Sequence, residues 1–196
     1  MQNKGFSLIE LIMVMALVAI VAAVVVPLIF RGGSTMTAAA MARKVKADIQ
    51  YAQELAMAKN NMAQVWTGAA WCPAQPQNYR IRMNFAANQY EIYNDQDGDG
   101  IWGEDSNACT VSEDVRNPSS GEVFFLIQLT GAGNPYTGIT LNANFGGATP
   151  GVLEFDALGI PYDSDGNRLT ADKTITIAKD GETAQITVTQ NTGRVQ

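Results

Sequence analysis

Apolar residues are concentrated at the start of the chain, in an almost unbroken run over residues 6–30. The run reads FSLIELIMVMALVAIVAAVVVPLIF and contains one charged residue, Glu10. At about 1.5 Å per residue, a helix of this length spans the hydrocarbon core of a bilayer. The run is also longer than the apolar region of an ordinary signal peptide, and no A-x-A cleavage site closes it. The pattern therefore predicts one membrane-spanning helix.

A second helical pattern follows over residues 34–61. Pro27 and the glycine pair after it separate the two patterns, and they predict either a kink or a simple break. Thr35 or Thr37 is expected to cap the second helix, and Asn60-Asn61 to end it. Its apolar residues recur every three or four positions, which is typical of an amphipathic helix packed on a domain: Met41, Val45, Ile49, Ala52, Leu55 and Ala56.

From residue 62 the spacing of apolar residues shortens to two, which predicts a β-rich head domain over residues 62–196. We expect a hairpin from 79–83 and 90–93, then strands at 122–129, 139–141 and 152–155. A last hairpin joins 174–178 to 184–189 through Asp180-Gly181, a pair that favours a tight primed turn. The expected fold class is α+β: a long N-terminal helix over 6–61, membrane-spanning in its first half, packed on an antiparallel β-sheet head.

Composition narrows the range of functions. The chain has no histidine, which excludes His-based catalytic triads and His-ligated metals. A nucleophile would need a carboxylate pair or a Ser–Lys arrangement, and neither Lys173 nor Lys179 lies in a recognisable motif. We therefore expect no enzymatic activity. Past residue 60, seven Lys or Arg face sixteen Asp or Glu, a net charge of −9 that disfavours binding to a phosphate backbone.

Glu10 is the exceptional residue of the apolar run. A carboxylate in a membrane segment costs roughly 2–3 kcal/mol or more, so it usually has a function and a partner. Lys4, Gly5 and Phe6 precede it in the sequence KGFSLIE. This motif, followed by an apolar helix, resembles the class III signal of type IV pilins and pseudopilins.

The resemblance implies how the N-terminus is processed and used. Residues 1–5 would be a leader that prepilin peptidase removes after Gly5, and Phe6 would become the N-methylated first residue. Glu10 would be the assembly carboxylate that neutralises the terminal ammonium of a neighbouring subunit. The protein would cross the bacterial inner membrane once with its head in the periplasm, and then enter a pilus or pseudopilus filament. Its partners would be other pilin or pseudopilin subunits and an inner-membrane assembly platform.

Two further stretches resemble the GspH/FimT group of minor pseudopilins and minor pilins. They are residues 41–61 and the C-terminal LEFDALGIPYDSDG and TITIAKDGETAQITVTQNTGRVQ. The implied function is that of a minor subunit that helps to initiate or cap a type IV pilus or a type II secretion pseudopilus. One alternative is a major pilin. Another is a DNA-uptake pilin that binds through its C-terminus, but Gly193-Arg194-Val195-Gln196 lacks the second arginine of that motif.

Closely spaced acidic residues suggest a calcium site. Asp95, Asp97 and Asp99 match the first, third and fifth positions of an EF-hand loop, and Gly100 matches its turn. Ser106 stands where the loop usually ends in Glu, so other carboxylates would complete the coordination of Ca²⁺. The candidate ligands for a structural Ca²⁺ are Asp95, Asp97, Asp99, Glu104 and Asp105. A solvated acidic turn is the alternative, and it is the preferred interpretation of the weaker cluster at 163–167.

The two cysteines, Cys72 and Cys109, both lie in the head domain. The topology implied by the resemblance places them in the periplasm, where disulfides persist. A bridge would stabilise the fold by about 3–4 kcal/mol through loop closure. Two unpaired thiols are the alternative.

Overall fold

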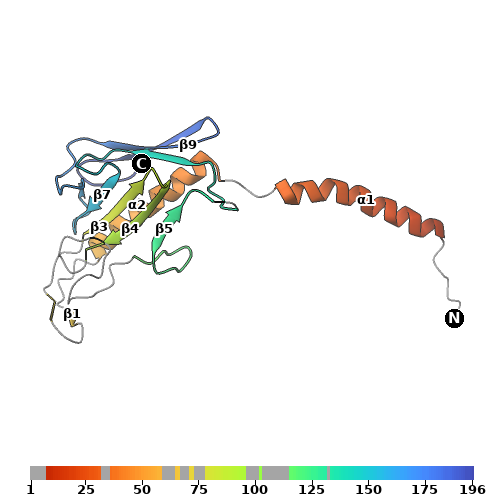
Figure 1. Ribbon diagram of the computed structural model, residues 1–196, viewed down its shortest axis with the longest axis horizontal. Coiled ribbons are helices and arrows are strands. Elements are labelled where there is room, and N and C mark those ends of the chain that lie inside the picture. Colours follow the sequence, from red (N-terminus) through yellow and green to blue (C-terminus); the bar gives the residue numbers. More distant parts are fainter. Residues whose placement is uncertain are drawn as a thin grey trace. The chain divides into compact units, whose positions relative to one another are not determined.

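The computed structural model describes residues 8–31, 36–58, 65–66, 71–72, 78–95, 102, 115–131 and 133–196, and of residues 24–31, 65–66 and 71–72 only the backbone. The chain divides into two compact units, one up to Thr35 and one from Met36. The first unit contains helix α1, Leu8–Arg31, and the second contains α2 and the strands (Figure 1).

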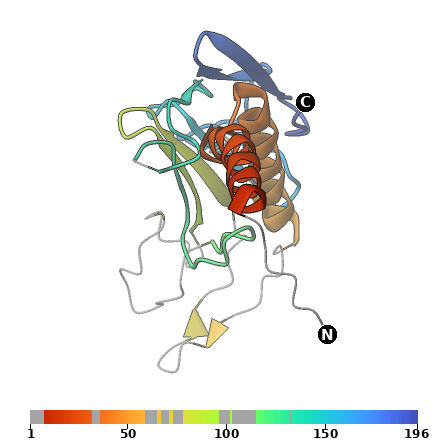
Figure 2. The same cartoon turned by 90° about the vertical axis from the view of Figure 1, so that its right-hand side faces the viewer.

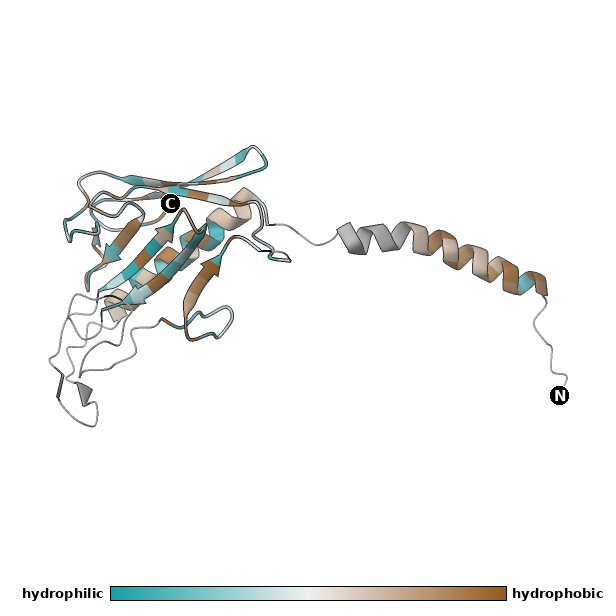
Figure 3. Cartoon of the chain, in the orientation of Figure 1, coloured by the Kyte–Doolittle hydropathy of each residue, from teal (hydrophilic) through white to brown (hydrophobic). Residues whose placement is uncertain are grey.

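Helix α1 continues through Pro27 to Arg31, so the proline does not end it. All of its described side chains, residues 8–23, are exposed, and hydrophobic residues predominate along them (Figure 3). Among the described residues, no helix is both long and apolar enough to cross a membrane.

Helix α2, Ala38–Ala58, belongs to the second unit together with three antiparallel sheets. The five-stranded sheet has the order β5-β4-β3-β7-β8, and the three-stranded sheet the order β10-β9-β6. Strands β1 and β2 form a separate pair. The strands are β1 Val65–Trp66, β2 Trp71–Cys72, β3 Tyr79–Asn84, β4 Gln89–Asn94, β5 Phe125–Gln128, β6 Thr140–Ala143, β7 Val152–Phe155, β8 Pro161–Tyr162, β9 Lys173–Lys179 and β10 Glu182–Val188.

The core lies between α2 and the two larger sheets. The helix contacts β3 and β7 of one sheet and β9 and β10 of the other (Figures 1 and 2). Met41, Val45 and Ile49 are fully buried on its inner face, and full burial of such a side chain stabilises a fold by about 1.5–3 kcal/mol. The Oγ1 of Thr37 accepts a 3.2 Å hydrogen bond from the N–H of Ala40, so Thr37 is the N-cap.

The predicted α+β class is confirmed, with α2 as the helix that packs on the sheets. Strands β3 and β4 form the predicted hairpin. Strands β9 and β10 form the last one, and both Asp180 (φ 50°) and Gly181 (φ 83°) adopt the positive φ of a type I′ turn. The strand predicted at 122–129 is shorter, because Val123 and Phe124 form a bend that leaves both side chains exposed.

Candidate functional site

The residues of the N-terminal motif are described in part. Gly5 and Phe6 lie outside the described residues. Glu10 lies in the first turn of α1, where a negative charge interacts favourably with the helix dipole. Its neighbours Leu8 and Ile9 are 78% and 67% exposed. Contiguous apolar surface of this kind marks a segment that other protein chains or lipid cover.

The proposed calcium ligands cannot be assembled from the described residues. Asp95 follows β4 directly, whereas Asp97, Asp99, Glu104 and Asp105 lie outside them. Within the described ranges, no group of three or more acidic, Cys or His side chains is placed to hold a metal. The calcium site therefore stays a prediction.

The predicted disulfide also involves side chains that lie outside the described residues. The backbone of Cys72 ends β2, paired with Val65 of β1, while its side chain is outside the description. Cys109 lies outside it altogether. The disulfide stays a prediction too.

The weaker acidic cluster at 163–167 forms the predicted turn. The Oδ1 of Asp163 accepts hydrogen bonds from the N–H groups of Asp165 (3.0 Å) and Asn167 (2.9 Å). The Oδ1 of Asp165 accepts another, at 3.0 Å, from the N–H of Ala148. These carboxylates thus satisfy backbone donors and join the turn to the loop before β7.

A charged and aromatic cluster lies across β3, β4 and β7. The Arg80 guanidinium forms an ion pair with Glu154 at 2.8 Å and stacks on the ring of Trp102 at 3.7 Å. Trp102 also meets Tyr93 edge to face, with ring centroids 5.9 Å apart. Because the Glu154 side chain is only 7% exposed, Arg80 is its main source of charge compensation.

A second arginine extends this cluster toward solvent. Arg82 pairs with Glu91, its cross-strand neighbour, and its guanidinium lies 5.1 Å from the Tyr93 ring centroid. The alternation of Arg80 and Arg82 with apolar residues predicted strand β3. The sequence contains no sign that Trp102 would stack on Arg80 of this strand. The hairpin register would have been enough to pair Arg82 with Glu91.

A buried carboxylate in α2 was missed by the sequence analysis. Asp48 accepts hydrogen bonds from the hydroxyl of Tyr90 and from the ammonium of Lys44, the latter at 3.0 Å. Burial raises the pKa of Asp48, against the lowering effects of Tyr90 and Lys44, and burial also raises the pKa of Tyr90 well above its ordinary value. The position of Asp48, three residues after Val45 on the apolar stripe, is the signal that could have revealed it.

The C-terminal residues pack against the rest of the head domain. Val195 is buried and bridges to Val188, while Gln196 exchanges backbone hydrogen bonds with Thr187. On α2, the amide of Gln53 donates to the carbonyls of Gly159 (2.8 Å) and Thr192 (2.7 Å). Arg194 is exposed beside this contact.

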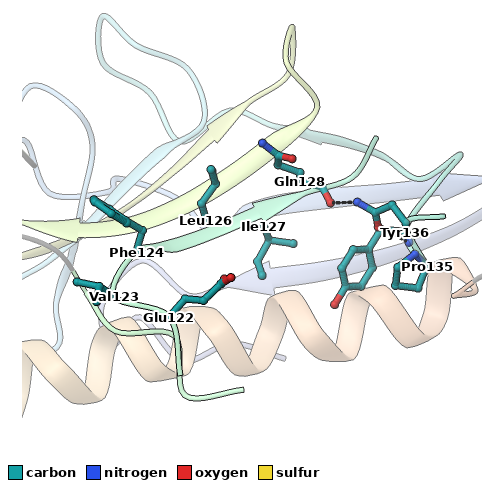
Figure 4. A pocket seen from close by; sticks show the side chains of 9 residues that line it. Glu122, Val123, Phe124, Leu126, Ile127, Gln128, Pro135 and Tyr136 are labelled. Atoms are coloured by element: carbon teal, nitrogen blue, oxygen red, sulfur yellow. Dashed lines mark hydrogen bonds between the residues drawn. The ribbon is translucent and has the colours of Figure 1, made fainter. Parts of the chain in front are cut away.

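A pocket of about 690 Å³ lies beside β5, at the edge of the five-stranded sheet (Figure 4). Leu126 and Ile127 point to opposite sides of the strand, and Pro135 and Tyr136 close one end of the pocket. A smaller pocket of about 260 Å³ shares Phe124 and Leu126 with it and reaches Arg82 and Trp102. The β5 edge and the charged and aromatic cluster are therefore neighbouring parts of one surface.

Comparison with known proteins identifies the N-terminal segment. Residues 1–26 match the model of the prokaryotic N-terminal methylation motif. A comparison with curated proteins gives no match. Two solved structures of the minor pseudopilin EpsH from the type 2 secretion system of Vibrio cholerae are similar, with TM-scores of 0.45 and 0.44 and 15% and 13% sequence identity. They cover 81% and 84% of this chain and 94% and 92% of their own chains. The signature predicted from KGFSLIE is thereby confirmed: the chain carries the N-terminal methylation motif of type IV pilins and pseudopilins.

Proposed function

We propose that this protein is a structural subunit of a type IV pilus or a type II secretion pseudopilus, with no catalytic role of its own. The observation that carries the proposal is the methylation motif at residues 1–26, which includes most of helix α1, and the described side chains of this helix are all exposed and largely apolar. The antiparallel head with α2 on it supplies a folded body for that helix to carry.

The proposed mechanism is assembly by burial. Residues 6–30 anchor the subunit in the inner membrane, with the head in the periplasm. The assembly platform then extracts the helix, which packs among the helices of neighbouring subunits, so that protein replaces lipid around it. Glu10 neutralises the terminal ammonium of an adjacent subunit and fixes the register, because an unpaired charge at low dielectric costs several kcal/mol.

A minor subunit is the role that we favour within this class. The similarity of residues 41–61 and of the C-terminus to the GspH/FimT group supports it. A major pilin is the alternative. DNA uptake through the C-terminus has less support, since Arg194 is the lone arginine of that motif and the head carries a net charge of −9 past residue 60.

Co-expression with a prepilin peptidase tests the proposal. The mature protein should begin at Phe6 and carry one added methyl group, as read by intact mass and N-terminal peptide spectra. Gly5→Val should leave the leader in place without changing the fold of the head. An unprocessed wild-type chain in the presence of active peptidase would refute the assignment.

Calcium and a disulfide complete the proposal for the head domain. We propose that Asp95, Asp97 and Asp99, with Glu104 and Asp105, bind a structural Ca²⁺ in the connection after β4. Calorimetry on chelator-treated protein should show uptake, and none at millimolar Ca²⁺ would refute the site. A bond between Cys72 and Cys109 should make the oxidised protein lighter than the reduced form by two hydrogens.

A further inference from the structure

We propose that the outer edge of β5 is a docking site for a short extended segment of a different protein chain, which adds an antiparallel strand to the five-stranded sheet. The segment would carry apolar side chains on one face and a Lys or Arg at its C-terminal end. This inference uses the head domain alone, so it goes beyond the proposed assembly role and can fail or hold independently of N-terminal processing.

The register of β5 shows which of its backbone groups face outward. Among the residues that the structure describes, the strand pairs with β4 alone. Leu129 donates its N–H to the carbonyl of Asn88 at 2.9 Å, so this pair and every second pair along the ladder exchange hydrogen bonds. Leu126 and Gln128 fall between those pairs. Their N–H and C=O groups therefore point away from β4, as on an edge that can accept another strand.

One end of this edge is already occupied. The side-chain amide of Asn134 donates to the carbonyls of Gln128 (2.7 Å) and Thr130 (3.1 Å). Two β5 edges paired antiparallel about Leu126 would each need the Gln128 carbonyl of the other copy as an acceptor. Asn134 thus disfavours a second copy and leaves the stretch around Phe124 and Leu126 open to a shorter strand.

The side chains along the open stretch define the chemistry of the partner. Val123 and Phe124 are 51% and 65% exposed, and the pocket of about 690 Å³ runs from them to Tyr136. Burying such side chains under a partner contributes about 25 cal/mol per Å². Glu122 is the charged member of the lining, and it takes part in none of the ion pairs among the described residues. Glu122 lies before the N-terminal end of β5. An antiparallel partner strand therefore ends beside Glu122, so the Lys or Arg that pairs with Glu122 belongs at the C-terminal end of the partner segment.

The test uses the full chain in detergent micelles and a fluorescent hexapeptide, acetyl-Thr-Val-Thr-Val-Thr-Lys-amide, with fluorescence anisotropy as the readout. Leu126→Pro removes the outward N–H without touching the ladder to β4, a position where edge strands tolerate proline. We expect it to weaken binding at least about tenfold, because the complex loses one hydrogen bond and the Leu126 side chain that lines the pocket. Phe124→Ser should weaken binding by a similar factor. Leu158→Ser, which removes a 74% exposed leucine outside the pocket, should leave binding unchanged.

The charge of Glu122 gives a second test of the proposal that does not depend on the strand hydrogen bonds. Glu122→Gln should weaken binding of the Lys peptide at low salt and improve binding of a matched peptide that ends in Glu. The thermal midpoint of each variant controls for folding. No binding at millimolar peptide would overturn the proposal, and so would binding that persists in both Leu126→Pro and Phe124→Ser. A reversible dimer of the full chain that both variants abolish would also overturn it, since the edge would then bind a second copy.

Discussion

At the scale of single residues, two buried carboxylates, Glu154 and Asp48, are stabilised by different partners. Glu154 is paired with the permanent charge of Arg80 and also accepts a 2.6 Å hydrogen bond from the side-chain amide of Asn78. Asp48 is held by a tyrosine hydroxyl and a lysine ammonium, and its pKa is raised because burial outweighs both. Two changes should therefore affect the stability of the head in different ways. One is the removal of Arg80, the partner of Glu154. The other is a change of pH that ionises Asp48.

We expect Arg80→Ala to lower the free energy of unfolding by about 3 kcal/mol, because it leaves Glu154 buried with Asn78 as its one side-chain hydrogen-bond partner among the described residues. Arg82→Ala is the matched control. Its side chain is 50% exposed and its pair with Glu91 should contribute about 0–1 kcal/mol. Denaturant unfolding of the detergent-solubilised chain measures both. Equal losses in the two variants would contradict this account of the cluster.

The raised pKa of Asp48 predicts a pH dependence. Ionisation costs more in the folded state than in the unfolded chain, where an Asp titrates near about 3.9. The stability linked to Asp48 is therefore full below that pH and declines as pH rises through the folded pKa. Asp48→Asn removes this titration but keeps an acceptor for Tyr90 and Lys44. The stability of wild type relative to Asp48→Asn should thus fall as the pH rises above about 4. A relative stability that rises would mean that Lys44 outweighs burial.

At the scale of elements, helix α2 and the C-terminus are joined at one close contact. Gln53 binds two carbonyls there, and Gly193 (φ 62°) passes directly beneath its amide. A Cβ on Gly193 would lie 2.7 Å from the Gln53 amide nitrogen and 2.7 Å from the Gly159 carbonyl oxygen. The glycine is therefore required both by its backbone conformation and by the space around it.

Gly193→Ala should destabilise the head by about 2–4 kcal/mol, since strain from the left-handed backbone adds to overpacking. Gly181→Ala provides the comparison, because it has a similar positive φ (83°) but nothing within 4 Å of the added Cβ. We expect it to cost about 1 kcal/mol, measured by the shift in the denaturant midpoint at constant slope. If the two variants unfold alike, the close contact does not contribute to stability.

The elements of the head were predictable where local pattern decides them. The apolar stripe of α2 and the Asp180-Gly181 turn follow from spacing and turn chemistry alone, and the sequence narrowed the N-cap to Thr35 or Thr37. Contacts made at long range were not predictable. Nothing in the sequence near Glu154 indicates Arg80, which is 74 residues away. The order of strands in the two sheets, and hence the open edge at β5, also depends on packing that no single segment encodes.

In the candidate site, too, the local motif could be predicted from the sequence and the features that need long-range contacts could not. Residues 4–10 belong to a linear motif that is matched over residues 1–26, so their sequence is sufficient to recognise them. The pocket beside β5 combines residues 122–128 with residues 134–136 and requires the fold to bring them together. The sequence predicted a strand over 122–129, whereas the bend at Val123 and Phe124 shortens it and exposes both side chains.

At the scale of the whole molecule, the chain consists of a head with its own core and a separate helical unit in which none of the described side chains is buried. The large apolar side chains of α1 that are described, from Leu8 to Val21, are each at least 50% exposed. Under the proposed function, the free energy of covering them is available to a membrane first and to neighbouring subunits later. Glu10 is the charged interruption of this surface.

We expect Glu10→Lys to leave membrane insertion and head stability unchanged and to reduce incorporation into filaments at least about tenfold, since it places like charges together at low dielectric. Glu54→Lys makes the same charge change on the exposed side of α2 and should be incorporated normally. Fractionation and immunodetection of sheared filaments compare the two. Normal incorporation of Glu10→Lys would contradict the role of this carboxylate.

The central claim, a processed filament subunit, is tested most directly by quantitative mass spectrometry of sheared and purified filaments from the native host. The account predicts an N-terminal peptide that begins at N-methylated Phe6, present at a ratio far below one relative to the most abundant subunit. A ratio near one would make the protein a major pilin. A chain missing from filaments, or one that still begins at Met1, would contradict the account itself.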